Sequence, residues 1–330
     1  MEGGETMTNY QSQFSSILAS QIIALIEEKR AFGYKYESLN YFRLLDRFIV
    51  EQKLKKISLP RYLVEQWIKR RDHEASVTHG HRVTAILLLA EFMVRNGISA
   101  YYPPKAAIPK SVCNFIPYIF SHDEITSLFK EADKLKKERP QRWNYARFPT
   151  VIRLLYSTGL RIGEVANLVW QDVDFDSGVI KIRQGKFHKD RFVPLSVQML
   201  KSLKKYSEQQ VYVPDDYVFP SATGTRSHHC TFYRCFHEVL KRIGIKYIPK
   251  KGPRLHDLRH TFAVHNLEKW LKSRENLQVK LPILADYLGH TSLLGTQKYL
   301  RLTPSIFPEI ALRMEKSIGK LIRSYKNETN

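Results

Sequence analysis

Apolar residues recur at helical spacing in four segments of the first hundred residues. These segments are FSSILASQIIALIEEKRAFG, LNYFRLLDRFIVEQ, LPRYLVEQWIKRR and RVTAILLLAEFMVRNG. The spacing predicts amphipathic helices. Gly33 and Gly97 end two of the segments just beyond the apolar pattern, where a left-handed C-cap is expected, and Pro60 fits the first turn of a third. The pattern therefore predicts a four-helix domain over residues 14–100.

A proline-rich stretch separates this domain from the rest of the chain. ISAYYPPKAAIPKSVCNFIP contains four prolines and no helical period, which predicts a semi-rigid linker over residues 101–116. Ser121 and Glu124 follow with the spacing of a capping box, in which each side chain binds a backbone amide of a new helix. A second domain is therefore expected over residues 117–310.

The second domain combines helices with a small sheet. FPTVIRLLYSTGLRIGEVANLVW predicts two helices around a turn at Thr158 and Gly159, and GVIKIRQ and DRFVPL alternate like two strands joined by the basic tip GKFHK. Helical patterns return in SVQMLKSLKKYSEQQ, CTFYRCFHEVLKRIG, HDLRHTFAVHNLEKWL and LPILADYLGH. The predicted fold class is mainly α with a small antiparallel β-sheet.

Charge narrows the range of partners. The chain has 53 Lys and Arg against 32 Asp and Glu, a formal charge of +21, of which residues 117–330 carry +16. Charged residues are usually solvated surface, but an excess this large favours a polyanionic partner, with nucleic acid first. Three cysteines without a paired framework indicate a reducing compartment. The sequence predicts a cytoplasmic protein with no signal peptide and no membrane span.

Reactive side chains occur at four separated places: Arg161 in TGLRIGE, Lys186 in QGKFHKDR, His256 and Arg259 in HDLRH, and His290 with Tyr299 in LGHTSLLGTQKYL. Two arginines can hold a phosphodiester and stabilise its transition state, a tyrosine can attack it, and a lysine can protonate the leaving oxygen. Each motif alone has a simpler explanation: Arg161 could pair with Glu164 on a helix surface, and Tyr299 could be a packing residue. Their joint occurrence in a basic chain favours chemistry on a phosphodiester.

The motifs resemble those of the tyrosine recombinase, or phage integrase, family. TGLRIGEVANLVWQDVDF resembles its first arginine motif, HDLRHTFA its His-x-x-Arg motif, and LGHTSLLGTQKYL its terminal histidine and nucleophile motif. The resemblance extends over roughly residues 15–310. It implies a SAM-like helical core-binding domain followed by a mixed α/β catalytic domain.

The family resemblance assigns a role to each motif residue. It implies that Tyr299 forms a covalent 3′-phosphotyrosyl link, that Arg161 and Arg259 activate the phosphate, and that His256 assists as general acid or base. His290 is the expected ligand of the phosphate or of the transition state. Lys186 is the expected general acid, with Lys189 as an alternative because Phe187 and His188 replace the small turn residues of the family. No metal or other cofactor is expected.

The resemblance also implies double-stranded DNA as the partner. A homotetramer on paired sites is expected, and accessory proteins remain open. Residues 311–330 form a C-terminal tail that could contact a neighbouring protomer. A type IB topoisomerase and a catalytically silent DNA-binding protein are the alternatives, and the sequence does not decide among integration, transposition, resolution and inversion.

One further cluster of metal-binding residue types falls outside these motifs. HHCTFYRCFH contains His228, His229, Cys230, Cys235 and His237. Their spacing matches no paired zinc framework. Buried thiols and DNA-facing histidines on a helix are the simpler interpretation.

Overall fold

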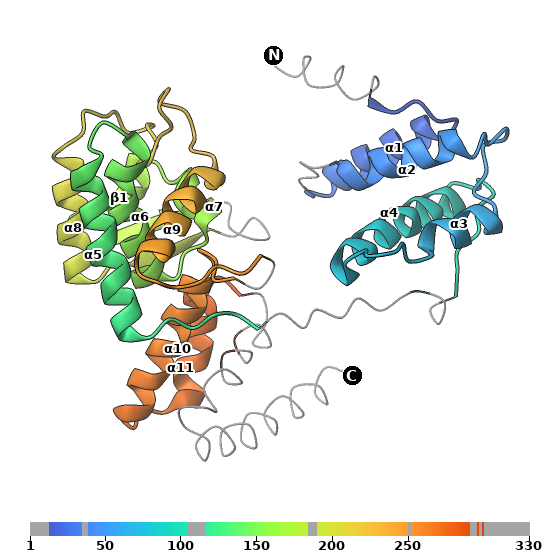
Figure 1. Ribbon diagram of the computed structural model, residues 1–330. Helices are drawn as coiled ribbons and strands as arrows, with labels where there is room; N and C mark the ends of the chain where they lie inside the picture. The colour runs from blue at the N-terminus through green and yellow to red at the C-terminus, as the bar shows by residue number, and fades with distance from the viewer. Residues whose placement is uncertain are drawn as a thin grey trace. The chain divides into compact units, whose positions relative to one another are not determined.

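The computed structural model describes residues 13–34, 39–104, 108, 116–183, 190–249, 252–290, 296 and 299. The chain forms two compact units, residues 1–115 and 116–330 (Figure 1). Helices dominate both units, as the sequence predicts. No helix among the described residues is long and apolar enough to cross a membrane.

The N-terminal unit consists of helices packed on α4. Its helices are α1 (Ala19–Ala31), α2 (Asn40–Glu51), α3 (Arg61–Ile68) and α4 (Ser76–Arg95). α4 contacts each of the other three helices. Its apolar residues lie on several faces of the helix, and the other helices cover these faces. Gly33 and Gly97 adopt positive φ angles, as predicted. Pro60 is the N-cap of α3 and precedes its first turn, one residue earlier than expected.

A buried arginine links α3 to α4. Arg82 is 2% exposed, and its guanidinium donates to the carbonyl oxygens of Trp67 and Lys69 and to the Glu74 carboxylate, at 2.8 Å from Lys69 and 2.9 Å from Glu74. Hydrogen bonds from Arg82 outweigh burial and hold the pKa of Glu74 at about 2. A buried ion pair needs both partners, because one left alone is an uncompensated charge.

We predict that Glu74→Gln destabilises the N-terminal unit in a pH-dependent way. The folded-state pKa of Glu74 lies below its unfolded value, so its contribution is complete above pH ~4.5 and is lost as the pH falls towards about 2. Hydrogen exchange of α3 and α4 peptides in the full chain should be faster in the variant at neutral pH. The difference should shrink in acid. Exchange that differs equally at every pH would contradict the assignment.

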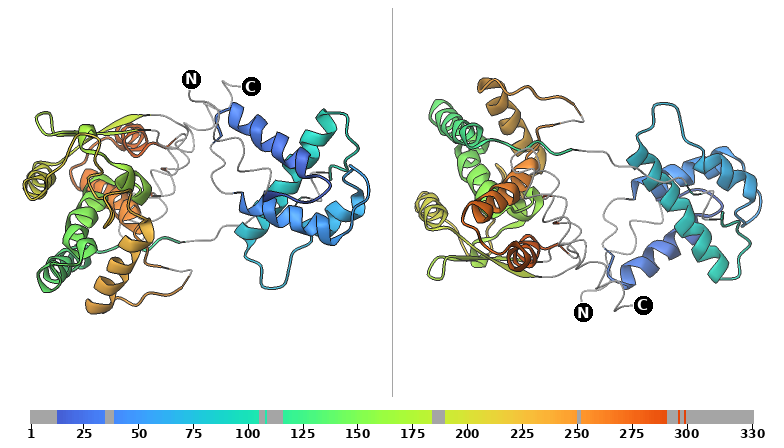
Figure 2. Two further views of the ribbon diagram at one scale, coloured as in Figure 1. Left: turned by 90° about the horizontal axis from the view of Figure 1, so that it is seen from above. Right: turned by 90° about the horizontal axis from the view of Figure 1, so that it is seen from below.

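The C-terminal unit is built around α6. Its helices are α5 (His122–Glu138), α6 (Trp143–Thr158), α7 (Ile162–Asn167), α8 (Val197–Ser207), α9 (His229–Arg242), α10 (Asp257–Lys272) and α11 (Leu277–Leu288). α6 contacts α5, α7, α8, α9 and α10, and Figure 2 shows it among them. α5 begins with the predicted capping box, in which Ser121 and Glu124 exchange hydrogen bonds. α6 starts earlier than the sequence pattern and contains Pro149.

A three-stranded antiparallel sheet completes the unit. Its strands are β1 (Val173–Asp174), β2 (Val179–Ile182) and β3 (Arg191–Pro194), in the order β1-β2-β3, with Ile180 opposite Val193. β2 and β3 are the predicted strands, and β1 is too short to leave an alternating pattern. α11 contacts β3, which brings the C-terminal helices to the sheet.

α10 and α11 lie side by side and enclose a small apolar core (Figure 1). Its buried members are Ala263, Val264, Leu267, Leu277, Leu281, Leu284, Leu288 and Tyr299. Tyr299 is the only one of these that does not come from the two helices. The apolar faces of α10 and α11 therefore bury the Tyr299 ring beside the first turns of α10.

Candidate active site

The turn between α6 and α7 forms one wall of the candidate site. Gly159 has φ +62°, and a Cβ atom there would lie 2.7 Å from Phe262 and 2.8 Å from Leu288. Only glycine fits this close approach without a shift of α10 or α11. The turn places the carbonyl oxygen of Gly159 and the side chain of Arg161 at the same edge of the unit.

Arg259 lies in the first turn of α10 and is 2% exposed. Its guanidinium donates to the carbonyl oxygens of Gly159 at 2.7 Å and Leu288 at 2.6 Å. No carboxylate lies within ion-pair distance of it among the described residues. Burial, reinforced by the charge of Arg161, lowers the pKa of Arg259 to about 10. Among the described residues, the site thus contains a buried cation with no carboxylate at ion-pair distance, which is the arrangement that an anionic ligand stabilises.

Arg161 is held by a largely buried carboxylate, that of Glu164. Its Nη1 donates to Glu164 at 2.7 Å, and its Nη2 lies 3.5 Å from the carbonyl oxygen of Gly289. Glu164 also accepts two hydrogen bonds from Arg191, at 3.0 and 2.8 Å, and the Arg191 Nε donates to the Tyr287 carbonyl oxygen at 3.0 Å. Burial alone would raise the pKa of Glu164, but Arg191 and Arg161 lower it to about 2. This network joins α7, β3 and α11.

We predict that Glu164→Gln slows the reaction catalysed at this site about tenfold to a hundredfold. The neutral amide no longer balances Arg161 and Arg191, so Arg161 shifts from its position, and a displacement of about 1 Å can cost about 10²-fold in rate. Single-turnover kinetics measure the effect. Glu131→Gln is the matched control, because Glu131 pairs with Arg242 on another face. Equal rates in the two variants would contradict the role of the network.

Two histidines accompany Arg259 at the start of α10. His256 is the N-cap residue, and His260 lies one turn later, with its ring 5.0 Å from that of His256. Burial, followed by the charges of Arg259, Arg254 and Arg161, lowers the pKa of His256 to about 4. The His256 imidazole is therefore neutral at physiological pH.

His290 and Tyr299 complete the cluster. Gly289 ends α11 in the left-handed region, and the backbone amide of His290 then donates to the carbonyl oxygen of Ala285 at 2.8 Å. The His290 Nδ1 lies 2.8 Å from the Thr296 hydroxyl, and its ring stacks on that of Tyr299 at 6.0 Å. Tyr299 is 2% exposed. Burial raises its pKa, and Arg259 and Arg161 oppose that rise.

The structure thus brings together five of the predicted residues: Arg161, His256, Arg259, His290 and Tyr299. Lys186 and the alternative Lys189 lie outside the described residues. Sequence reasoning missed Arg191 and underestimated Glu164, which it considered only as a surface partner of Arg161. The alternation of β3 could have indicated Arg191, because this residue shares a face of the strand with the buried Val193.

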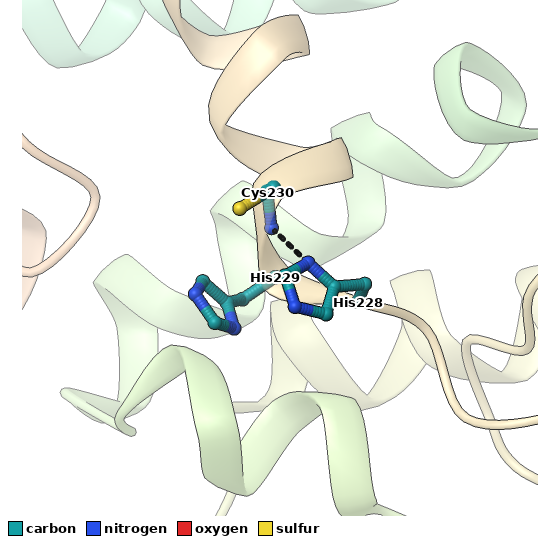
Figure 3. Close-up of side chains that lie close together, drawn as sticks. All are labelled: His228, His229 and Cys230. Carbon is teal, nitrogen blue, oxygen red and sulfur yellow. Dashed lines mark hydrogen bonds between the residues drawn. The ribbon is translucent and has the colours of Figure 1, made fainter. Parts of the chain in front are cut away.

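The histidine and cysteine cluster of α9 is divided between surface and interior. His228, His229 and Cys230 are exposed at the start of the helix, with ligand atoms within 4.8 Å of one another (Figure 3). The His228 Nδ1 accepts a hydrogen bond from the Cys230 amide at 3.3 Å. Cys235 is buried, whereas Cys230 is exposed, so the expectation of buried thiols is wrong for Cys230.

Comparisons with known proteins identify the family of the chain. The model of the phage integrase family matches residues 119–305. Protein y4rB of Sinorhizobium fredii is 29% identical over 303 residues, which cover 88% of this chain and 95% of that protein. Tyrosine recombinase XerA of Pyrococcus furiosus is 31% identical over 220 residues, covering 64% of this chain and 66% of that protein.

A solved structure shows the same fold. The XerH site-specific recombinase, crystallised in a post-cleavage complex with its palindromic difH substrate, superposes with a TM-score of 0.64 at 18% identity. The match covers 93% of this chain and 91% of that one. The chain belongs to the phage integrase family. It is a tyrosine-type site-specific recombinase, an enzyme that cleaves and rejoins DNA strands.

Proposed function

We propose that Tyr299 attacks the scissile phosphate of double-stranded DNA and forms a covalent 3′-phosphotyrosyl intermediate. The observation that carries this assignment is the burial of Tyr299 beside Arg259, a cation with no carboxylate partner among the described residues. A tyrosine needs an activated phosphate to attack, and a guanidinium supplies donors in a fork that matches two phosphate oxygens. The phosphodiester supplies the anion that Arg259 lacks.

Arg161 and Arg259 act as the phosphate clamp. Both guanidinium groups are fixed by hydrogen bonds to protein oxygens before DNA binds, so little reorganisation is required during the reaction. His290 is the additional ligand of the phosphate, held in place by Thr296. His256 is neutral and can exchange a proton with the reacting groups. The proposed steps use only side chains of this chain.

The proposal also gives a role to each part of the chain and to its assembly on DNA. Residues 14–100 form the core-binding domain that holds the DNA, residues 117–310 perform catalysis, and residues 311–330 contact a neighbouring protomer. Four protomers assemble on two DNA sites in the cytoplasm, where the enzyme associates with the nucleoid. The net charge of +16 on residues 117–330 supports binding through phosphates and a steep dependence on salt.

Covalent trapping tests the proposal. The protein is incubated with a nicked duplex of its own recombination site, labelled on either side of the nick, and the mixture is separated under denaturing conditions. We expect an adduct that retains the label on the 3′-phosphate side and a free 5′-hydroxyl on the other. No adduct, or an adduct through the 5′ side, would refute the proposal.

We predict that Lys186→Ala slows cleavage of ordinary DNA by about 10²- to 10⁴-fold, as expected for loss of a general acid. A 5′-bridging phosphorothiolate should restore the rate, because a thiolate leaves without a proton. Lys189→Ala is the matched comparison and should cleave both substrates at nearly the wild-type rate. If the two variants exchange these behaviours, Lys189 is the acid.

A further inference from the structure

His260 is a half-buried polar residue whose ring packs against that of Tyr299, and the family motif His-x-x-Arg leaves it without a role. His256 and His260 are four residues apart on α10 and share one face of the helix. The His260 ring lies 5.0 Å from that of His256 and 5.5 Å from that of Tyr299, measured between ring centroids. His260 therefore contacts both residues.

One ring nitrogen of His260, its Nδ1, is buried and forms no hydrogen bond with the described residues. An unsatisfied buried polar atom costs about 1 to 3 kcal/mol and calls for an explanation. An apolar ring would make the same contacts with His256 and Tyr299 without this cost. Packing alone thus does not account for a histidine here.

The other histidines of the cluster are less suited to act on Tyr299. The His290 Nδ1 is engaged by the Thr296 hydroxyl, and its ring centroid is 6.0 Å from that of Tyr299. No ring contact joins His256 to Tyr299 among the described residues. Among the described residues, His260 has the shortest ring separation from Tyr299 of the three histidines, and its Nδ1 forms no hydrogen bond.

Burial, together with the positive charge around it, favours the neutral ring of His260. Burial lowers its pKa to about 3, and His256, Arg254, Arg259 and His290 act in the same direction. A neutral imidazole can accept a proton, whereas a charged one cannot. A phosphodiester bound to Arg161 and Arg259 would offset part of this positive field and raise the pKa of His260 when the reaction begins.

We propose that His260 accepts the phenolic proton of Tyr299 during strand cleavage and returns it during rejoining. The inference rests on the proposed function of Tyr299. As the bond from the Tyr299 Oη to phosphorus forms, the Oη–H bond breaks and the proton passes to the His260 imidazole. The bond from phosphorus to the 5′ oxygen breaks, and that oxygen takes its proton from the general acid. Rejoining reverses both transfers.

A nucleophile with a lower phenol pKa depends less on a proton acceptor. Replacing Tyr299 with such a phenol therefore tests whether His260 accepts its proton or only packs against its ring. His260→Phe keeps a ring but removes both nitrogens, and we expect it to slow single-turnover cleavage of a 5′-phosphorothiolate duplex about a hundredfold. This substrate removes the need to protonate the leaving group. Incorporation of trifluorotyrosine at position 299 lowers the phenol pKa and should bring the variant to within about tenfold of the wild type.

The controls separate this inference from the proposed function. His265→Phe, on the same helix, should cleave at the wild-type rate, because its Nδ1 contacts Tyr156 and its ring stacks on His122. His260→Asn replaces His260→Phe if the latter does not fold, with the same expectation. A variant that cleaves like the wild type, or a slow one that trifluorotyrosine does not restore, would overturn the role of His260. Absence of a wild-type adduct would instead refute the role of Tyr299.

Discussion

Tyr299→Phe should form no detectable covalent adduct with a nicked recombination site. The substitution removes only the hydroxyl, so the ring can still fill the core between α10 and α11. Cleavage requires an oxygen nucleophile at this position, so we expect no other group in the site to replace the Tyr299 hydroxyl. The variant should still bind DNA without cleaving it. Gel retention of the duplex, with and without denaturation, measures both properties.

A neighbouring tyrosine provides the control for this result. Tyr287 packs against the same small core, and its hydroxyl donates to the carbonyl oxygen of Pro194 at 3.2 Å. Tyr287→Phe removes the same atom from the same region and should retain the adduct. An adduct of undiminished yield in Tyr299→Phe would show that another nucleophile is responsible. Loss of DNA binding in both variants would indicate a structural defect.

Arg259→Lys should reduce the cleavage rate by about 10²- to 10³-fold. Lysine keeps the positive charge but lacks the planar fork that binds the carbonyl oxygens of Gly159 and Leu288 while facing a phosphate. Loss of one preorganised donor to a transition-state oxyanion has an effect of about this size in other enzymes. Single-turnover cleavage at saturating protein isolates the effect from DNA affinity.

An arginine on another surface provides the comparison. Arg153 forms a partly exposed ion pair with Asp133 at 2.6 Å. Arg153→Lys should cleave DNA at nearly the wild-type rate, because exposed pairs contribute little and this one lies outside the cluster. Similar rates for Arg259→Lys and Arg153→Lys would show that charge alone is sufficient at position 259. The phosphate clamp would then need a different explanation.

Local sequence patterns predict much of the fold. The capping box at Ser121 and Glu124 and the left-handed glycines Gly33 and Gly97 depend on interactions within a few residues, so they are readable from the sequence. Pro149 shows the limit. The predicted helical segment begins at residue 148, yet Pro149 lies inside α6, where the packing of five other helices outweighs the loss of one backbone donor.

The candidate site was only partly predictable from the sequence, because part of it depends on packing between segments that are far apart in the chain. Arg161, His256, Arg259, His290 and Tyr299 stand in recognisable motifs, and their residue types suggest phosphate chemistry. The network of Glu164 and Arg191 depends on the approach of α7, β3 and α11, which are far apart in the sequence. The unpaired nitrogen of His260 likewise becomes visible only when α10 is packed against Tyr299.

The most direct test of the account is to identify the residue that carries the DNA. The wild-type adduct is digested with a protease and a nuclease, and the nucleotide-bearing peptide is sequenced by mass spectrometry. We expect a single modified residue, Tyr299, among the 18 tyrosines of the chain, joined to a DNA 3′-phosphate. A nucleotide attached to any other residue, or through a 5′-phosphate, would contradict the account.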